Sequence, residues 1–200
     1  MTISRRTASL NRTTAETTIA LSLDLDGTGN ASVETGIGFL DHMLNLFARH
    51  GLIDLTLKAK GDLHIDAHHT VEDTGIVLGQ ALKQAVGDKK GLVRYGFFLL
   101  PMDETLARVA VDFSGRPFHV FELPRPADPI GGSFPFTLVE EFFRALAFNA
   151  GMNLHQTVLY GRDSHHMAEA LFKGTARAIG SATRIDERIA GRIPSTKESL

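Results

Sequence analysis

The amino-acid sequence predicts an α+β fold made of two β-β-β-α-β-α half-domains, each a small sheet with two helices on one face. Three observations support this prediction. The segments 16–27 and 104–115 share a pattern of Glu-Thr, alternating apolar residues and a closing Asp-x-x-Gly. An amphipathic helical segment follows each of them. A second helical segment, which begins with two adjacent histidines, comes later in each half, and such self-similarity indicates duplication.

The elements of the first half are predicted from the spacing of its apolar residues. Residues 17–25 alternate between apolar and polar side chains, as in a half-buried strand. Residues 38–50 carry apolar side chains at helical spacing, and Gly51 is expected to end that helix. A short apolar strand is expected at 52–57, and the helix that opens with a histidine pair at about 67–86.

The second half repeats these elements in the same order. A helix is predicted at 136–150 with Gly151 as its stop, a strand at 152–160, and a helix at about 164–183. The charged, glycine-flanked segment 87–91 is predicted to be the turn between the halves. Because each sheet would keep one uncovered face, these faces are expected to pack on each other or on neighbouring subunits.

The chain is predicted to form one domain from two repeats, about 1–88 and 91–185, with a C-terminal tail at 186–200. Segment 1–16 is rich in Arg, Ser and Thr, as transit peptides are, but a strand pattern follows it directly. We interpret that segment as part of the fold. The polar tail from Gly191 is expected to be mobile unless a ligand orders it.

Composition and charge exclude several classes of protein. A formal net charge of -2 gives no general attraction to nucleic acid or to an anionic membrane, so any phosphate binding must be local. No apolar stretch approaches the roughly 18 residues of a membrane span. The chain has 0 cysteines, which excludes a disulfide framework and thiolate chemistry and agrees with a cytoplasmic protein. No nucleic-acid or membrane partner is therefore expected.

The two histidine pairs belong to one motif, His-His-x-x-Glu, which occurs at 68–72 and at 165–169. Residues four apart lie on one face of a helix, so the first histidine and the glutamate can bind one metal ion together. The second histidine points about 100° away and is suited to another ion. A single pair at a helix start is usually a polar cap, but two copies at matching places favour metal binding.

A further ligand is expected from the first helix of each half, where His42 corresponds to Glu141. Packing of the halves around a pseudo-twofold axis would let each ion take ligands from both motifs. One site is then predicted from His42, His69, His165 and Glu169, and the other from Glu141, His68, Glu72 and His166. Shells of nitrogen and oxygen suit manganese or iron, with zinc or cobalt as alternatives.

At nearly full length, the sequence resembles the imidazoleglycerol-phosphate dehydratase family. The resemblance rests on these blocks: Arg12 to Thr17, Thr35 to Leu44, His68 to Asp73, Asp112 to Pro117, His165 to Lys173 and Pro194 to Lys197. It implies a fold like domain 2 of ribosomal protein S5. It also implies a lyase that dehydrates D-erythro-imidazole-glycerol phosphate to imidazole-acetol phosphate in histidine biosynthesis. Two manganese ions per active site and a homo-oligomer of twenty-four subunits built from trimers are implied as well.

The resemblance also implies roles for individual residues of this single catalytic domain. Glu16 is expected to be an acid-base group, and no catalytic role is transferred to its repeat mate Glu104. The expected catalytic residues are Glu16, His42, His69 and Glu169. The expected substrate contacts are Glu16, His42, Met43, Leu44, Asn45, Leu46, Phe47, His68, His69, Thr70, Val71, Glu72, Arg94, Arg116, His165, His166, Glu169, Lys173, Ser195, Thr196 and Lys197. Arg94, Arg116, Lys173, Ser195 and Lys197 are expected at the phosphate. Some family members carry His where this chain has Glu141, and Glu is also a ligand for hard metals.

The implied reaction explains why two ions would be needed. The carbon that loses its proton lies next to no carbonyl group, so simple abstraction has no electron sink. Two metals, one on each ring nitrogen, would stabilise an imidazolate that can expel the adjacent hydroxyl. Two alternative functions predict different metal sites. A dinuclear hydrolase of a phosphorylated metabolite would favour Asp-rich bridging ligands, and a purely structural metal assembly would have closed coordination.

Overall fold

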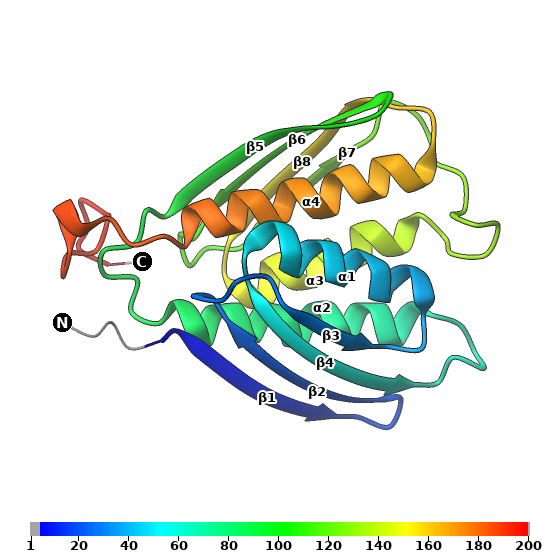
Figure 1. Ribbon diagram of the computed structural model, residues 1–200, viewed down its shortest axis with the longest axis horizontal. Coiled ribbons are helices and arrows are strands. Elements are labelled where there is room, and N and C mark those ends of the chain that lie inside the picture. The colour runs from blue at the N-terminus through cyan, green and yellow to red at the C-terminus, as the bar shows by residue number, and fades with distance from the viewer. Residues whose placement is uncertain (1–4, 200) are drawn as a thin grey trace.

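A computed structural model describes residues 5–199 of the chain. Its first half contains β1 (Thr7–Thr13), β2 (Thr17–Asp24), β3 (Ala31–Glu34), α1 (Gly38–Gly51), β4 (Asp54–Gly61) and α2 (His68–Val86) (Figure 1). Its second half contains β5 (Tyr95–Met102), β6 (Thr105–Asp112), β7 (Phe118–Glu122), α3 (Thr137–Ala150), β8 (Asn153–Tyr160) and α4 (Ser164–Ala182). A short 3-10 helix (Glu187–Ile189) lies within the C-terminal tail.

The two halves form sheets with the same topology. In the first sheet the order is β1-β2-β4-β3, with β3 parallel to β4 and the other neighbours antiparallel. The second sheet has the equivalent order β5-β6-β8-β7, again with its last pair parallel. The predicted α+β fold of two β-β-β-α-β-α half-domains is therefore confirmed.

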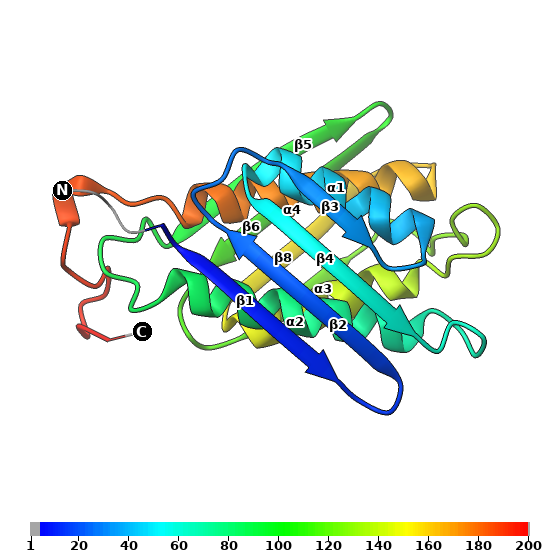
Figure 2. The same ribbon diagram turned by 60° about the horizontal axis from the view of Figure 1, so that its bottom comes forward.

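The α-helices of the described chain lie between the two sheets (Figures 1 and 2). Each sheet packs against the two helices of its own half on one face, as predicted. Helix α1 also packs against α4, and α2 against α3, so the halves join through their helices. The outer faces of the sheets point away from each other, so the alternative that they pack on each other is wrong. The other alternative, that they pack on neighbouring subunits, stays a prediction. Within residues 5–199, no helix is long and apolar enough to cross a membrane.

The end of α1 differs from the prediction by one residue. Gly151 has a φ of 66° and caps α3 in the left-handed conformation, as expected. Gly51 instead belongs to α1, and Leu52, with a φ of 57°, is the C-cap. Glycine at position 51 allows α4 to cross close to α1, because a β-carbon there would lie 3.3 Å from the carbonyl oxygen of Ala176.

Small residues also set the approach of α2 to α3. A β-carbon at Gly75 would lie 2.6 Å from the carbonyl oxygen of Phe142 and 3.0 Å from the Ala145 β-carbon. Both distances are too short for a real side chain to fit without moving a backbone. Gly75 therefore allows the crossing that brings the first turn of α2 next to α3.

A methyl group at Gly75 is expected to push α2 and α3 apart. We expect Gly75→Ala to lower the free energy of unfolding by about 2 kcal/mol through overpacking. Gly38→Ala is the matched control, because no atom lies within 4 Å of a β-carbon at that helical glycine. Thermal and denaturant unfolding of the two variants measure the difference. Equal melting temperatures would contradict the packing argument.

Candidate metal centre

Both histidine pairs lie in the first turn of a long helix. In each case the carboxylate of a nearby aspartate accepts hydrogen bonds from backbone N–H groups of that turn. Asp163 is the N-cap of α4 and accepts hydrogen bonds from the backbone N–H groups of His165 (2.7 Å) and His166 (3.1 Å). Asp66 accepts one from the backbone of His68 (2.7 Å). Such caps satisfy N–H groups that have no partner inside the helix. They fix the direction in which each pair leaves the helix.

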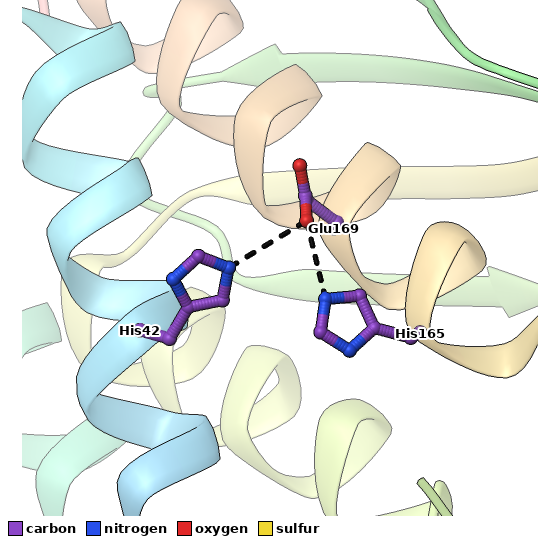
Figure 3. Close-up of side chains that lie close together, drawn as sticks. All are labelled: His42, His165 and Glu169. Atoms are coloured by element: carbon purple, nitrogen blue, oxygen red, sulfur yellow. Dashed lines mark ion pairs between the residues drawn. The ribbon is translucent and has the colours of Figure 1, made fainter. Parts of the chain in front are cut away.

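One cluster of metal-ligating side chains lies where α1 crosses α4 (Figure 3). Nε2 of His165 is 3.3 Å, and Nε2 of His42 3.6 Å, from the same carboxylate oxygen of Glu169. The glutamate side chain is 10% exposed, and the two imidazoles are about half exposed, at 43% and 48%. The cluster is therefore open on the side of its histidines.

An equivalent cluster lies where α2 meets α3. It consists of His68, Glu72 and Glu141. Nε2 of His68 is 3.6 Å from Glu72, and the guanidinium of Arg144 contacts both carboxylates, 3.5 Å from Glu72. Exchange of the repeats converts one cluster into the other, with Glu141 in the place of His42.

The donor atoms fit a divalent cation. In each cluster the donors of all three residues lie within 4.8 Å of one another. Adjacent ligands about 2.1 Å from one ion lie about 3 Å apart, close to the separations in the first cluster. Burial raises the pKa of Glu169, but the ammonium of Lys173 and both neighbouring histidines lower it overall. Arg144 likewise holds the pKa of the Glu141 carboxyl below its usual value, so both carboxylates favour the anionic form that binds metal.

The second histidine of each pair points elsewhere. Nδ1 of His69 lies 3.0 Å from a carboxylate oxygen of Asp62, and Nδ1 of His166 lies 2.7 Å from Glu104. These hydrogen bonds raise the pKa of both imidazoles. Among the described residues of one chain, neither histidine joins the cluster for which it was predicted.

Glu16 lies beside this second histidine of the first half. It occupies the turn between β1 and β2, with a carboxylate oxygen 3.6 Å from Nε2 of His69 and a side chain that is 52% exposed. The turn is braced by Arg12, whose guanidinium donates two hydrogen bonds to Asp73 of α2, at 2.9 and 3.0 Å. Thr17 donates a third bond to the same carboxylate. Glu16 therefore projects from a rigid support next to a candidate ligand.

Most of the residues expected at the phosphate gather around one cavity of about 940 Å³. Its lining includes Arg94, Arg116, Ser195, Thr196 and Lys197, together with Lys90 and Arg192. Arg94 is buried and its guanidinium donates a forked pair of hydrogen bonds to Asp112, at 2.7 and 3.1 Å. It also donates to the carbonyl of Pro194 at 2.8 Å, which holds the tail in place.

This cationic cavity and the metal-ligating clusters lie at opposite ends of α4. His165 is at the start of α4, whereas the backbone N–H of Arg94 donates to the carbonyl of Ala182 at its end. The 17 residue steps from His165 to Ala182 span about 26 Å of helix. Lys173 lies midway and pairs with Glu169, not with the cavity. Within one chain, the cationic cavity and the metal-ligating cluster of α4 are therefore separate.

Several predicted substrate contacts lie in the hydrophobic core. The side chains of these residues are fully buried: Met43, Leu44, Phe47, Thr70 and Val71. They pack behind the ligating side chains, and this geometry does not support direct contact of their side chains with a ligand. The neighbouring Asn45 and Leu46 are exposed and partly buried, respectively.

Sequence reasoning missed the aspartates and the arginine that complete these clusters. Asp62 and Asp66 lie in an irregular loop, where no periodicity indicates which side chain faces a histidine. Arg144 is three residues after Glu141, a spacing that is typical of ion pairs on helices and could have been noticed. Asp163 directly precedes α4, and a search for N-caps could have found it.

Comparison with known proteins decides the family. The family model for imidazoleglycerol-phosphate dehydratase matches residues 35–179. The chain belongs to this family. The assignment made from the sequence is therefore confirmed, and the matched range contains both histidine motifs and both clusters.

Relatives named imidazoleglycerol-phosphate dehydratase match nearly the whole chain. Those from Methylorubrum extorquens and Akkermansia muciniphila are each 60% identical over 195 residues, which is 98% of this chain and 100% of theirs. The family's crystal structure from Staphylococcus aureus has a TM-score of 0.81 at 42% identity, covering 90% of this chain and 99% of that one. The structure from Pyrococcus furiosus, in complex with (S)-C348, has a TM-score of 0.80 at 34% identity, covering 96% and 100%.

Proposed function

We propose that this chain is a lyase that dehydrates D-erythro-imidazole-glycerol phosphate to imidazole-acetol phosphate in histidine biosynthesis. Family membership and full-length identity to the named dehydratases support the reaction. The observation that carries the proposal is the pair of equivalent His and carboxylate clusters, related by the internal repeat. A substrate with an imidazole ring offers two nitrogens, and a repeat-related pair of metal sites can face both.

We propose two manganese ions per active site, with the ligands crossed between the repeats. His69 of another copy would complete the cluster of His42, His165 and Glu169. His166 of another copy would complete the cluster of His68, Glu72 and Glu141. The ions would supply Lewis-acid stabilisation of the imidazolate that the proposed route requires. The chain's own part is to hold the ring between its histidines and to keep Glu169 and Glu141 ionised.

The remaining residues are proposed to bind the glycerol phosphate and to take the proton that its carbon chain loses. Glu16, beside His69, would move the proton at the carbon chain, where its exposed carboxylate can reach a ligand. Arg116 and Lys197 would bind the phosphate with forked and single donors, while Arg94 holds the tail that carries Lys197. Because α4 separates these groups from the metal ligands, the complete site is proposed to form between subunits.

The outer faces of the two sheets support a homo-oligomer. On β5, alternate residues Tyr95, Phe97 and Leu99 are 57%, 81% and 55% exposed. Phe118 of β7 and Tyr160 of β8 also face outward, 59% and 58% exposed, with the polar Asp112 and Asn153 of the central strands between Phe118 and Tyr95. An apolar face of this kind is typical of a contact between chains.

The equivalent face of the first sheet is polar, with exposed Thr18, Ser22, Thr56 and Lys58. Duplication alone would have made the two faces alike. We propose that copies of the chain cover the apolar face in a trimer, and that eight trimers form the twenty-four-subunit particle. The single catalytic domain with its tail and the cytoplasmic location stay predictions.

The test is an assay of the purified protein with imidazole-glycerol phosphate, with and without manganese. Ketone formation that depends on added metal is the expected result. The metal-loaded protein is also expected to release no inorganic phosphate from the same substrate, which distinguishes a lyase from a dinuclear hydrolase. Phosphate release without ketone formation would overturn the proposal.

A further inference from the structure

The two halves of the chain hold their second histidine with different carboxylates. In the first half, His69 bonds through Nδ1 to Asp62, which follows the last residue of β4. In the second half, His166 bonds through Nδ1 to Glu104, which precedes β6. Glu104 is the repeat mate of Glu16, whereas Asp62 lies where the second half has Arg162. The same bond is therefore made from two non-equivalent positions.

Each carboxylate orients its imidazole by bonding to one of the two ring nitrogens, Nδ1. A ring nitrogen that donates its hydrogen to a carboxylate leaves the other nitrogen, Nε2, with a free lone pair for a metal ion. Nε2 of His69 and of His166 make only long contacts, 3.6 Å to Glu16 and 3.7 Å to the exposed Asp103. Both rings thus direct Nε2 away from the carboxylate that binds Nδ1.

Asp62 is held in a position that costs folding energy. Its side chain is 15% exposed, and its second oxygen, Oδ1, is buried with no hydrogen-bond partner among residues 5–199. A buried carboxylate oxygen without a partner is unfavourable for stability. The one hydrogen bond that its side chain makes within residues 5–199 is the bond to His69, so this bond is the structural role that the Asp62 carboxylate has.

Glu104 is held still more tightly. One of its oxygens accepts hydrogen bonds from the backbone N–H groups of Arg162 (3.1 Å) and Asp163 (2.9 Å), at the start of α4. The other oxygen faces His166. These contacts leave Glu104 no freedom to reach a ligand, whereas the Glu16 carboxylate, at the equivalent position, accepts no backbone hydrogen bond from residues 5–199 and stays exposed.

We infer that Asp62 and Glu104 are positioning residues that set the tautomer and direction of His69 and His166 for metal binding, and that Asp62 frees Glu16 to act on the substrate. This inference rests on the proposed function, because it takes these histidines as metal ligands. It adds two residues to the site, neither of which touches the ion. It also explains why one member of a duplicated Glu pair is free.

Glu104→Gln is the sharpest test. The amide oxygen would take the two backbone bonds, which turns the amide NH₂ toward His166. Nδ1 would then have to accept, so the ring proton would move to Nε2 and block the metal lone pair. Asp62→Ala removes the acceptor of His69, and Asp62→Asn restores it, since an amide oxygen can turn to Nδ1. Asp66→Asn is the control, because it removes a charge from the same loop and keeps the backbone bond to α2.

The measurement is manganese affinity by chelator competition, together with the anomalous signal at each metal position in crystals of the full assembly. Glu104→Gln and Asp62→Ala are each expected to weaken one site about 10- to 100-fold and to leave the other unchanged. Asp62→Asn is expected to recover most of the loss, and Asp66→Asn to match wild type. A fall in melting temperature with both sites weakened equally would make the carboxylates purely structural and overturn the inference.

Failure of the inference and failure of the proposed function give different results. Wild-type affinity at both sites in Glu104→Gln and Asp62→Ala would overturn the positioning role alone. A wild-type protein that binds no ion at either cluster, yet folds and assembles, would overturn the metal site on which the inference rests.

Discussion

Removal of divalent metal with a chelator is expected to abolish dehydration and to dissociate the assembly into trimers. Each cluster in a single chain offers three ligands, and the histidine predicted as the fourth points away toward its own carboxylate. If another copy supplies that histidine, the ion joins the two chains. Loss of the ion then removes both the Lewis acid and the contact.

Activity of the metal-free protein is expected to fall by about 100-fold or more, because metal stabilisation of developing charge contributes several kcal/mol. Sedimentation measures the assembly, and added manganese is expected to restore both properties. Trimers are expected to survive chelation because the apolar face of β5 contains no metal ligand. A particle that sediments unchanged after complete metal removal would contradict the intersubunit ligands.

The fold could be predicted from the sequence because its signals are local. Helical spacing of apolar residues gave α1 and α3 to within about a residue, and the internal repeat gave the order of elements. The order of strands could not be predicted in this way. The parallel pairing of Ala31–Glu34 with β4 joins segments that an entire helix separates, and nothing in the short strand itself indicates its partner. The position of the helices between the sheets also depends on close contacts such as Gly75 with Phe142.

The same distinction between local and distant contacts applies to the candidate site. His165 and Glu169 are four residues apart on one helix, so their meeting follows from helix geometry alone. The contact of His42 with Glu169 was predicted only through the repeat, which placed α1 and α3 in equivalent positions. The role of Asp62 could not be predicted from the sequence, because its bond to His69 depends on the path of a six-residue loop. The role of Glu104 was hidden for another reason: a repeat mate shares its local pattern but not its loop partners.

Loss of the Glu16 carboxylate is expected to give the largest effect of any single substitution that leaves the metal sites intact. Glu16→Gln keeps the size of the side chain and the turn, which Arg12, Thr17 and Asp73 brace independently. If Glu16 moves the proton at the carbon chain, kcat is expected to fall about 10²- to 10⁴-fold, the usual contribution of a general acid-base group. KM is expected to change little, because the ring and phosphate contacts remain.

Manganese content separates this role from a structural one. Glu16 lies 3.6 Å from Nε2 of His69 in the isolated chain, so a change of metal affinity in Glu16→Gln would mean that the carboxylate supports the ion. Unchanged manganese content with a low kcat is the expected result. Glu34→Gln is the matched control, an exposed glutamate that pairs with Lys58 on the sheet surface and should retain full activity. Wild-type kcat in Glu16→Gln would transfer the proton step to another group, and the partly exposed histidines of the two pairs would then be the residues to replace.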